Sequence, residues 1–174
     1  MTRLPALDPA RIHPVYAGTN ALSPFHACYA NPNTVLRLAA GRFFVHYNGE
    51  DITATYWALR RAAVLYDVPE RPVEISGPDA VPFLDRIFTR RSNDIKIGRG
   101  RYVLACTHEG GLFMDGILFR LADDRFWFVQ PDGELDSWLW AHRHGHDVTI
   151  SDPHSRVLQL QGPKSLAIIN AASD

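Results

Sequence analysis

Apolar residues recur at two different periods along this chain, and the two periods predict strands and helices respectively. The run Arg42–Tyr47 has the composition of a short strand and is followed by an Asn-Gly turn. Apolar residues then recur at helical spacing, which predicts a helix that is capped by Asp51 or Thr53 and ends near Tyr66. Residues 1–35 show no sustained period, so we expect an arm with little regular structure there.

The pattern becomes more regular from Pro72 onward. Val73 and Ile75 alternate with polar neighbours, which predicts a strand that stops at Gly77-Pro78. Pro78 suits the first position of a helix, because its missing N–H has no intrahelical partner there. The apolar residues that follow have the spacing of a helix packed on one face: Ala80, Phe83, Leu84, Ile87 and Phe88.

Three consecutive strands are predicted after this helix. Residues 102–106 and 112–121 flank the turn Glu109-Gly110-Gly111, where glycine tolerates the positive φ of a tight hairpin. A second turn leads to a strand at 126–129, and an amphipathic helix is expected at 135–142. Antiparallel strands with helices between them indicate an α+β fold, not a doubly wound parallel sheet.

The last part of the chain echoes an earlier part. Short strands are expected at 148–150 and 157–160, followed by a helix from Pro163. Residues 74–80 and 159–165 share the pattern strand, Gly-Pro, helix. One interpretation is that Gly-Pro is a common stop between a strand and a helix. The other is a duplicated α+β unit.

The composition of the chain excludes some classes of binding partner. The 174 residues are 46% hydrophobic and 21% charged, with a formal net charge of -1. The basic residues are scattered, so we expect no nucleic acid and no anionic membrane surface as partner. No apolar run approaches the roughly 20 residues of a membrane helix. Residues 1–20 contain three prolines and no apolar stretch of the kind found in signal peptides, so we expect no secretory signal. Cys28 and Cys106 are expected to be free thiols of a cytoplasmic protein.

Asp115 is the most informative polar residue, because Asp is depleted in strands. Side chains alternate between the faces of a strand, so its neighbours on the same face are apolar or aromatic: Phe113, Ile117 and Phe119. A carboxylate buried on such a face needs a partner, which favours a functional role. The alternative is a β-bulge at Gly116 that turns Asp115 to solvent and leaves it without a role.

Tyr102 opens the partner strand of the same hairpin. An amphipathic ring near a carboxylate could stack on a flat heterocycle, although a cross-strand aromatic pair explains it equally well. His142 and His146 have i, i+4 spacing, but Gly145 is expected to end the helix between them. We therefore expect a solvated helix end there and no metal site.

The tryptophans and the common site motifs add little. Core packing is the default expectation for Trp57, Trp127, Trp138 and Trp140. The sequence contains no phosphate-binding glycine loop, nucleophile elbow or zinc spacing.

Several short segments, in this order and spacing, resemble the folate-binding T-protein superfamily. That family includes the glycine-cleavage aminomethyltransferase, dimethylsulfoniopropionate demethylase, aryl-ether O-demethylases, and the folate domains of sarcosine and dimethylglycine dehydrogenases. The segments are Tyr66-Asp67-Val68, Ile75-Ser76-Gly77-Pro78-Asp79-Ala80, Phe83-Leu84-Asp85-Arg86, Gly100-Arg101-Tyr102, Gly110-Gly111 with Asp115 beyond them, Phe119-Arg120-Leu121, Asp124-Arg125-Phe126 and Leu160-Gln161-Gly162-Pro163.

The resemblance implies a fold and a division of the chain. An antiparallel sheet with helices is expected, in a ferredoxin-like α+β unit of a folate-binding domain. Residues 1–50 would form an N-terminal arm with a short strand, and residues 51–150 the ferredoxin-like part. Residues 151–174 would begin a second, related unit that is truncated, so the chain would be the N-terminal half of a longer enzyme.

The resemblance also implies a reaction. The family transfers a methyl or aminomethyl group from a small-molecule N-, S- or O-methyl donor to tetrahydrofolate. Its essential Asp falls on Asp115, beside the folate nitrogens, and its folate-contacting Tyr falls on Tyr102. The family's Tyr four residues after the Asp is Phe119 here. The segment Leu121–Trp127 is closest to the demethylase branch.

One departure bears on the substrate. Glycine-cleavage members read Asp-Val-Ser-His-Met where this chain reads Asp67-Val68-Pro69-Glu70-Arg71. This difference favours a methyl donor other than that of glycine cleavage. Two other functions stay open: a non-catalytic folate-binding regulatory or assembly protein, and an inactive truncated fragment. The sequence implies no particular oligomeric state.

Overall fold

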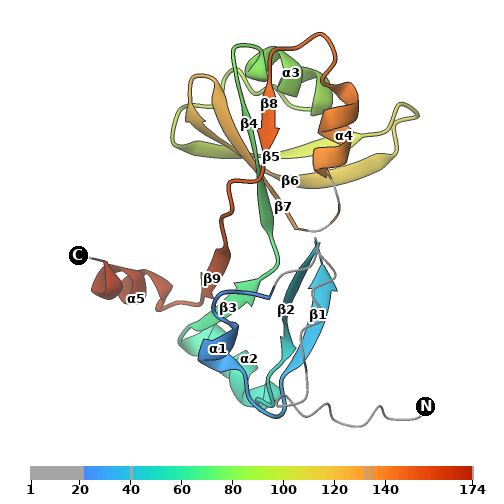
Figure 1. The fold of residues 1–174 in the computed structure, drawn as a ribbon. Helices are drawn as coiled ribbons and strands as arrows, with labels where there is room; N and C mark the ends of the chain where they lie inside the picture. The colour runs from blue at the N-terminus through green and yellow to red at the C-terminus, as the bar shows by residue number, and fades with distance from the viewer. Residues whose placement is uncertain (1–21, 40, 132, 134, 174) are drawn as a thin grey trace, which may run out of the picture. The chain divides into compact units, whose positions relative to one another are not determined.

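The structure is a computed structural model that describes residues 22–39, 41–131, 133 and 135–173. The chain folds into two compact units. Glu70–Arg156 forms unit two, and the flanking segments, up to Pro69 and from Val157 on, form unit one. Figure 1 shows the helices and strands of both units. The functional division at residues 50 and 150 that the sequence suggests stays a prediction.

The larger sheet lies in unit two, and its strands are ordered β5-β6-β7-β4-β8 with antiparallel neighbours throughout. Its strands are β4 (Arg71–Ser76), β5 (Arg99–Cys106), β6 (Leu112–Ala122), β7 (Arg125–Gln130) and β8 (Thr149–Ser151). Helix α3 follows β4, and helix α4 joins β7 to β8. Without β5, which is added at the edge, this is the β-α-β-β-α-β order of a ferredoxin-like unit. The predicted α+β fold is confirmed.

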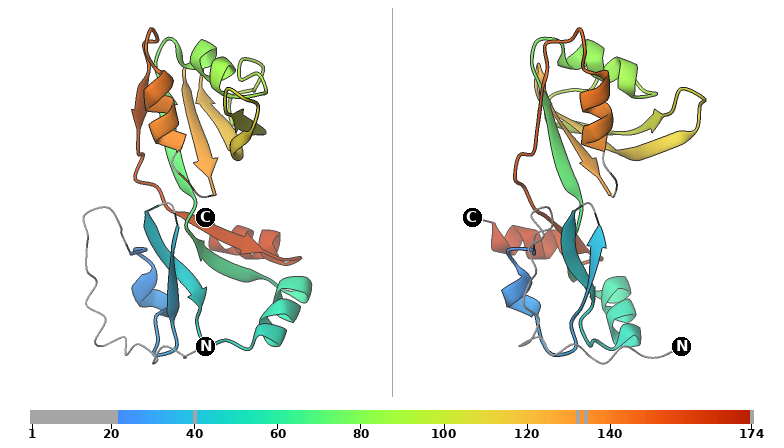
Figure 2. Two further views of the ribbon diagram at one scale, coloured as in Figure 1. Left: turned by 90° about the vertical axis from the view of Figure 1, so that its right-hand side faces the viewer. Right: turned by 45° about the vertical axis from the view of Figure 1, so that its right-hand side comes forward.

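The core of unit two lies between this sheet and helices α3 (Ala80–Ile87) and α4 (Leu135–His142), which contribute to one buried cluster (Figure 2). The predicted stripe of α3 is confirmed in full, since Phe83 and Leu84 are almost completely buried. The placement of Pro78 at the first helical position is wrong. Asp79 is the N-cap and the helix begins at Ala80, so Pro78 lies in the turn before it.

Unit one contains two small sheets, β1–β2 and β3–β9. Its elements are α1 (His26–Tyr29), β1 (Val35–Ala39), β2 (Arg42–Tyr47), α2 (Ile52–Arg61), β3 (Val64–Val68), β9 (Val157–Gln161) and α5 (Ser165–Ala172). The predicted strand 42–47 and the Asp51 cap are confirmed, since the Asp51 carboxylate accepts from two backbone N–H groups. The described part of the expected arm is more regular than predicted, because it includes α1 and leads into β1.

The predicted end of the helix near Tyr66 is wrong. Helix α2 ends at Arg61, and Tyr66 lies in β3, where it pairs with Gln159 of β9. The partner strand is about ninety residues away in sequence, so local spacing could not reveal it. Every buried apolar side chain among the described residues belongs to unit two. No helix in the described part of the chain is long and apolar enough to cross a membrane.

Candidate functional site

The two faces of the larger sheet differ in what covers them. Alternate side chains such as Val103, Leu118 and Phe128 are buried beneath α3 and α4. The opposite set faces away from these helices, and we call it the outer face. It comprises Tyr102, Leu104, Asp115, Ile117, Phe119, Trp127 and Val129. Because Tyr102 is 53% exposed and Ile117 is 41% exposed, this apolar face is open to a ligand.

The structure brings Tyr102 and Asp115 together on the outer face. Tyr102 pairs with Ile117 across the β5–β6 ladder, and Asp115 lies two residues before Ile117. The two side chains are therefore diagonal neighbours on one face of an antiparallel pair. The hydroxyl of Tyr102 donates a hydrogen bond to Oδ2 of Asp115. The hairpin thus presents one hydroxyl–carboxylate pair on an otherwise apolar surface.

This contact changes the acidity of the phenol. The hydrogen bond to Asp115 is the main cause that raises the pKa of Tyr102 above its ordinary value, and desolvation and the charge of Asp115 add to it. Tyr102 therefore remains a neutral hydrogen-bond donor at physiological pH.

The sequence left open a bulge at Gly116, and the structure does not have one. The ladder is continuous there, with Asp115 opposite Leu104 and Gly116 opposite Val103. The irregularity lies nearer the turn, between Ala105 and Cys106, where Phe113 has no partner in the register. The ring of Phe113 lies 4.9 Å from that of Trp138 on α4. Ile117 and Phe119 therefore share the face of Asp115 as predicted, whereas the shift in register takes Phe113 out of that set.

Gly116 has a packing role instead. A Cβ atom there would lie 2.5 Å from Cζ of Phe128 and 2.5 Å from the carbonyl oxygen of Val129. Both distances are far below van der Waals contact, so only glycine lets β7 approach β6 so closely. The β5–β6 ladder runs through Gly116 without a shift in register, so Asp115 stays on the outer face.

An open hollow of about 400 Å³ adjoins Asp115. It is lined by Leu112, Phe113, Met114, Asp115, Pro131 and Gly133. Small-molecule sites typically have volumes of roughly 300–1,000 Å³, so the hollow has room for part of a drug-sized ligand. Asp115 is the charged residue among those that line it.

A second polar group on the outer face was missed by the sequence analysis. Oε2 of Glu74 accepts hydrogen bonds from Nε of Arg125 at 2.8 Å and from Nε1 of Trp127 at 2.6 Å. Burial opposes ionisation of Glu74, but these hydrogen bonds outweigh it and hold the pKa of the carboxyl below its ordinary value. The indole of Trp127 is thereby held on the outer face and lies outside the core. The sequence did contain a signal for this position. Glu74 alternates with Val73 and Ile75, which places it on the opposite face of the strand from these two apolar residues.

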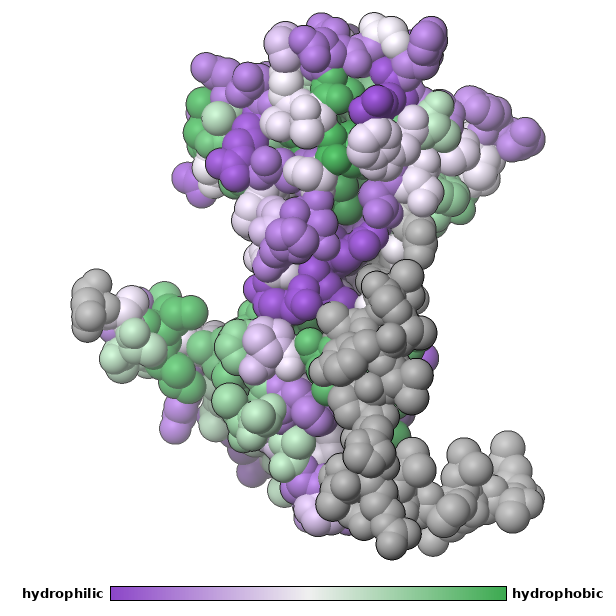
Figure 3. Space-filling view, in the orientation of Figure 1, coloured by the Kyte–Doolittle hydropathy of each residue, from purple (hydrophilic) through white to green (hydrophobic). Residues whose placement is uncertain are grey.

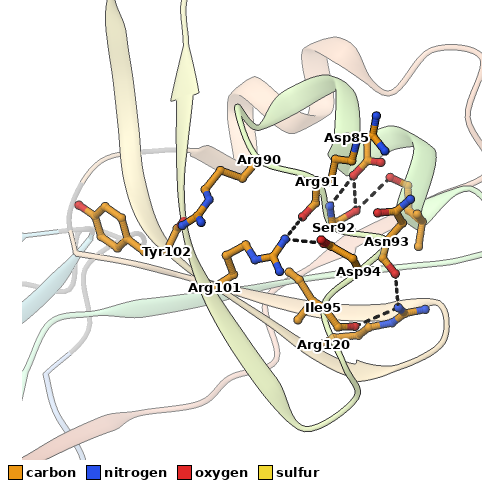
Figure 4. Close-up of polar contacts among 11 residues, drawn as sticks. Asp85, Arg90, Arg91, Ser92, Asn93, Asp94, Ile95, Arg101, Tyr102 and Arg120 are labelled. Carbon is orange, nitrogen blue, oxygen red and sulfur yellow. Dashed lines mark hydrogen bonds and ion pairs between the residues drawn. The ribbon is translucent and has the colours of Figure 1, made fainter.

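The loop between α3 and β5 holds the start of β5 in place (Figure 4). Asp85 accepts hydrogen bonds from the backbone N–H and the hydroxyl of the buried Ser92, both at 2.6 Å. Arg101 donates to the carbonyl oxygen of Arg91 at 2.9 Å and forms an ion pair with Asp94. The chain entering β5 is therefore fixed on both sides of Ser92.

The same loop reaches the backbone of Tyr102 but not its ring. Nη1 of Arg90 donates to the carbonyl oxygen of Tyr102 at 3.3 Å. Arg120 of β6 donates to the carbonyl oxygens of Asn93 and Ile95 at 3.0 and 3.1 Å. The ring of Tyr102 points away from all of these groups in Figure 4. The loop therefore positions the strand and leaves the phenol free to face a ligand.

The histidines and cysteines take other positions. Helix α4 ends at His142, before Gly145, so His142 and His146 do not share a helix face. His142 contacts the carbonyl oxygen of Trp138 at 2.8 Å, and the ring of His146 lies tilted against that of Phe83, with their centroids 5.3 Å apart. Both cysteines are free thiols. The structure shows no group of three or more potential metal ligands among the residues it describes.

The tryptophans divide between core and surface. Trp138 packs against the core as expected. The expectation of core packing is wrong for Trp57 and Trp140, which are 45% and 48% exposed and lie under Arg61 and Arg143 respectively. Trp127, on the outer face, also lies outside the core cluster.

Comparison with known proteins identifies relatives of this architecture. The chain is 30% identical to an aminomethyltransferase of Corynebacterium jeikeium over 138 residues, which cover 72% of this chain and 36% of the relative. It is 29% identical to a sarcosine oxidase subunit alpha of Corynebacterium sp. (strain P-1) over 182 residues, 97% of this chain and 18% of the relative. The chain thus spans about a third or less of the length of these curated relatives.

A solved structure shows the same fold. The crystal structure of the glycine cleavage system aminomethyltransferase T from Bartonella henselae matches with a TM-score of 0.77 and 25% identity, over 87% of this chain and 43% of that one. Residues 29–174 match the family described as the GCVT N-terminal domain. The chain therefore belongs to the glycine-cleavage T-protein family and corresponds to its N-terminal domain.

Proposed function

We propose that the outer face around Tyr102 and Asp115 binds tetrahydrofolate, and that Asp115 assists the transfer of a one-carbon group to it. The observation that carries this proposal is the hydroxyl–carboxylate pair on an open apolar sheet face, in a chain of the T-protein family. Relatives of this chain are named aminomethyltransferases, which supports a transferase role.

The residues present fit such a ligand. A pterin ring is flat and carries N–H groups, so it needs an apolar surface and a hydrogen-bond acceptor. Ile117 and Phe119 supply the first, and the carboxylate of Asp115 supplies the second. Tyr102 can stack its ring on the ligand, while its hydroxyl donates to Asp115. Phe119 offers no hydroxyl, so polar recognition at this end of the face depends on Tyr102 and Asp115.

In the proposed reaction, Asp115 acts as the proton acceptor. Tetrahydrofolate, when bound, supplies the nitrogen that accepts the carbon. Asp115 takes up the proton that this nitrogen releases as the new nitrogen–carbon bond forms. The electron pair of the broken carbon–heteroatom bond stays on the donor heteroatom, and the proton held by Asp115 passes to that atom when the donor would otherwise leave as an anion. Tyr102 holds the carboxylate in place by its hydrogen bond and limits the directions in which Asp115 can point.

The donor in this proposal is a small N-, S- or O-methyl compound, as in the demethylase branch of the family. Pro69-Glu70-Arg71 in place of Ser-His-Met supports a donor other than that of glycine cleavage. The two free thiols are in keeping with a cytoplasmic reaction.

Nuclear magnetic resonance of the ¹⁵N-labelled chain, titrated with tetrahydrofolate, tests the site. Amide shifts should concentrate at Tyr102, Leu104, Asp115 and Ile117, and Asp115→Ala should reduce them. Ile97→Ala is a matched control, since Ile97 is exposed but lies outside the outer face. Shifts confined to other parts of the chain, or none at millimolar ligand, would refute the assignment. Binding without turnover in a complete enzyme would favour the non-catalytic folate-binding role.

A further inference from the structure

Two histidines that are distant in sequence come together beside the indole of Trp138. His108 lies in the turn between β5 and β6, and His142 is the last residue of α4. Their Nε2 atoms are 3.5 Å apart. The ring centroid of Trp138 lies 5.7 Å from that of His108 and 4.2 Å from that of His142. Because Trp138 packs against the core of unit two, one anchored indole supports both imidazoles.

The hydrogen bonding of His142 determines which of its ring nitrogens is free. Nδ1 of His142 lies 2.8 Å from the carbonyl oxygen of Trp138. A carbonyl oxygen only accepts hydrogen bonds, so Nδ1 carries the proton and donates it. In the neutral ring, Nε2 then keeps its lone pair, and Nε2 is the atom that lies next to His108. Histidines that bind metals are usually oriented in this way, by donation from the other ring nitrogen.

The turn that carries His108 is closed by its own backbone. The N–H of Thr107 donates to the carbonyl oxygen of Gly111 at 2.8 Å, and the N–H of Gly110 donates to that of Thr107 at 3.0 Å. Gly110 has a φ of 84°, which glycine adopts without strain. The side chain of His108 is exposed, so its ring can turn without disturbing the core. The pair therefore has one fixed imidazole and one that can adjust.

The distance between the two Nε2 atoms suits a shared metal ion better than a hydrogen bond. Hydrogen bonds from N–H groups are typically about 2.9–3.0 Å long, so a separation of 3.5 Å makes only a weak one. Two nitrogens that each lie about 2.0–2.1 Å from one tetrahedral zinc ion are roughly 3.3–3.4 Å apart. A small turn of the exposed His108 ring is therefore enough to seat the ion.

The surroundings of the pair favour a cation. Hydrogen bonds from its own backbone and from a neighbouring hydroxyl hold the pKa of the Glu109 carboxyl below its ordinary value, and the electrostatic effect of His108 adds to them. The guanidinium of Arg143 lies over the ring of Trp140, 4.1 Å from its centroid. In the space-filling view, purple and white residues predominate over α4 and the β5–β6 hairpin (Figure 3). A hydrated ion can reach this surface.

We propose that His108 and His142 bind one divalent transition-metal ion, for which Zn²⁺ is the best match, with water completing its coordination. Imidazole nitrogen is a preferred ligand of zinc, whereas magnesium and calcium prefer oxygen. Two protein ligands make a weaker site than the three or four of catalytic and structural zinc centres. This agrees with the described residues, which contain no group of three potential ligands. The proposal is independent of the folate site.

The ion joins two elements that border the candidate site. His108 belongs to the β5–β6 hairpin and His142 to α4. The ring of Phe113 lies 4.9 Å from that of Trp138, and Phe113 lines the hollow beside Asp115. A bridging Zn²⁺ restricts the hairpin and keeps Phe113 against Trp138. Its role is to stabilise one wall of the hollow.

Nuclear magnetic resonance of the ¹⁵N-labelled 174-residue chain, titrated with Zn²⁺, identifies the ligands directly. In two-bond ¹H–¹⁵N spectra of the imidazoles, the Nε2 signals of His108 and His142 should move together as Zn²⁺ is added. The signals of the other histidines should stay in place. Amide hydrogen exchange at residues 107–111 should slow, because the ion fixes the hairpin to α4.

Isothermal titration calorimetry measures how the affinity depends on each histidine. His108→Ala and His142→Ala should each weaken Zn²⁺ binding by at least about 10-fold, because losing even a group that supports a metal ligand typically costs 10–100-fold. His144→Ala is the matched control. This histidine is exposed, two residues beyond His142 and outside the pair, so its loss should leave the affinity unchanged. His108 is exposed in a turn, so its variant should keep the circular dichroism of the parent chain.

Three results would overturn the proposal. One is an imidazole spectrum that does not change at millimolar Zn²⁺. Another is undiminished Zn²⁺ affinity in His108→Ala, which would place the ion elsewhere, with the free thiols of Cys28 and Cys106 as the first alternatives. The third is a dimer that forms on addition of Zn²⁺ in analytical ultracentrifugation, because the ion would then bridge two chains.

Discussion

Substituting Gly116 tests how the sheet holds the candidate site. In Gly116→Ala, the new methyl group would lie 2.5 Å from Cζ of Phe128 and 2.5 Å from the carbonyl oxygen of Val129. Phe128 is fully buried and stacks on Phe88, with their ring centroids 5.1 Å apart, so its ring has little room to turn. The carbonyl belongs to the backbone of β7 and can move only if the strand moves.

The expected cost follows from these contacts. Forcing an extra methyl group into a packed core typically costs roughly 1–3 kcal/mol. Replacing glycine by alanine in a strand otherwise gains about 0.5–1 kcal/mol, because the unfolded chain loses freedom. Since one of the two clashes is with the backbone, we expect the cost of overpacking to lie near the top of its range. After the gain from the unfolded chain is subtracted, Gly116→Ala should lower the free energy of unfolding by about 2 kcal/mol.

Urea unfolding, followed by circular dichroism, measures this difference. Gly111→Ala is the matched control in the same hairpin, because a Cβ there meets only the hydroxyl of Thr107, at 3.3 Å. The control should not destabilise the chain and should gain up to about 1 kcal/mol, because the unfolded chain loses the same freedom and no backbone clash opposes the gain. If Gly116→Ala were equally mild, β6 would have room that the packing argument denies, and a bulge at this glycine would have to be reconsidered.

Three further substitutions test the polar contacts. Asp115→Asn should preserve the circular dichroism of a complete enzyme but lower its turnover number by about 10²–10⁴-fold, and an unchanged turnover number would remove Asp115 from the mechanism. Asp115→Ala should lower the raised pKa of Tyr102. The pKa is measured from the tyrosinate absorbance in an alkaline titration. Because that pKa is raised in the folded state, the contribution of the contact to stability is present below the ordinary phenol pKa and is lost as pH rises through the raised value. An identical titration curve in the variant would contradict this coupling. Tyr29→Phe removes the hydroxyl that donates to the buried Asp67 at 2.9 Å, so the free energy of unfolding should fall by about 1–3 kcal/mol, and no change in urea unfolding would show that water replaces the bond.

The sequence alone was sufficient for elements whose contacts are local or periodic. The stripe of α3, the hairpin around Gly110 and the amphipathic face of α4 were all predicted, because their spacing reports directly which side is buried. Alternation in β6 also placed Asp115 on the same face as Ile117 and Phe119. The family was recognisable from short segments in a fixed order, and the comparisons confirm it.

Local pattern could not decide features that depend on distant partners. Alternation showed which side chains share a face of β6 but not which face the helices cover, so Asp115 was expected among buried aromatic neighbours and lies on the open side. Gly116 suggested a bulge, whereas the ring of Phe128 on the next strand explains it.

Tyr66 looked like the end of a helix because nothing near it in sequence reveals that β9 lies beside it. The contact between Tyr102 and Asp115 likewise exists only because the register of the hairpin makes them diagonal neighbours. The periodicity of a sequence shows which side chains of one helix or strand lie on the same face. Pairing between segments is set by packing and register, which form only when the segments meet.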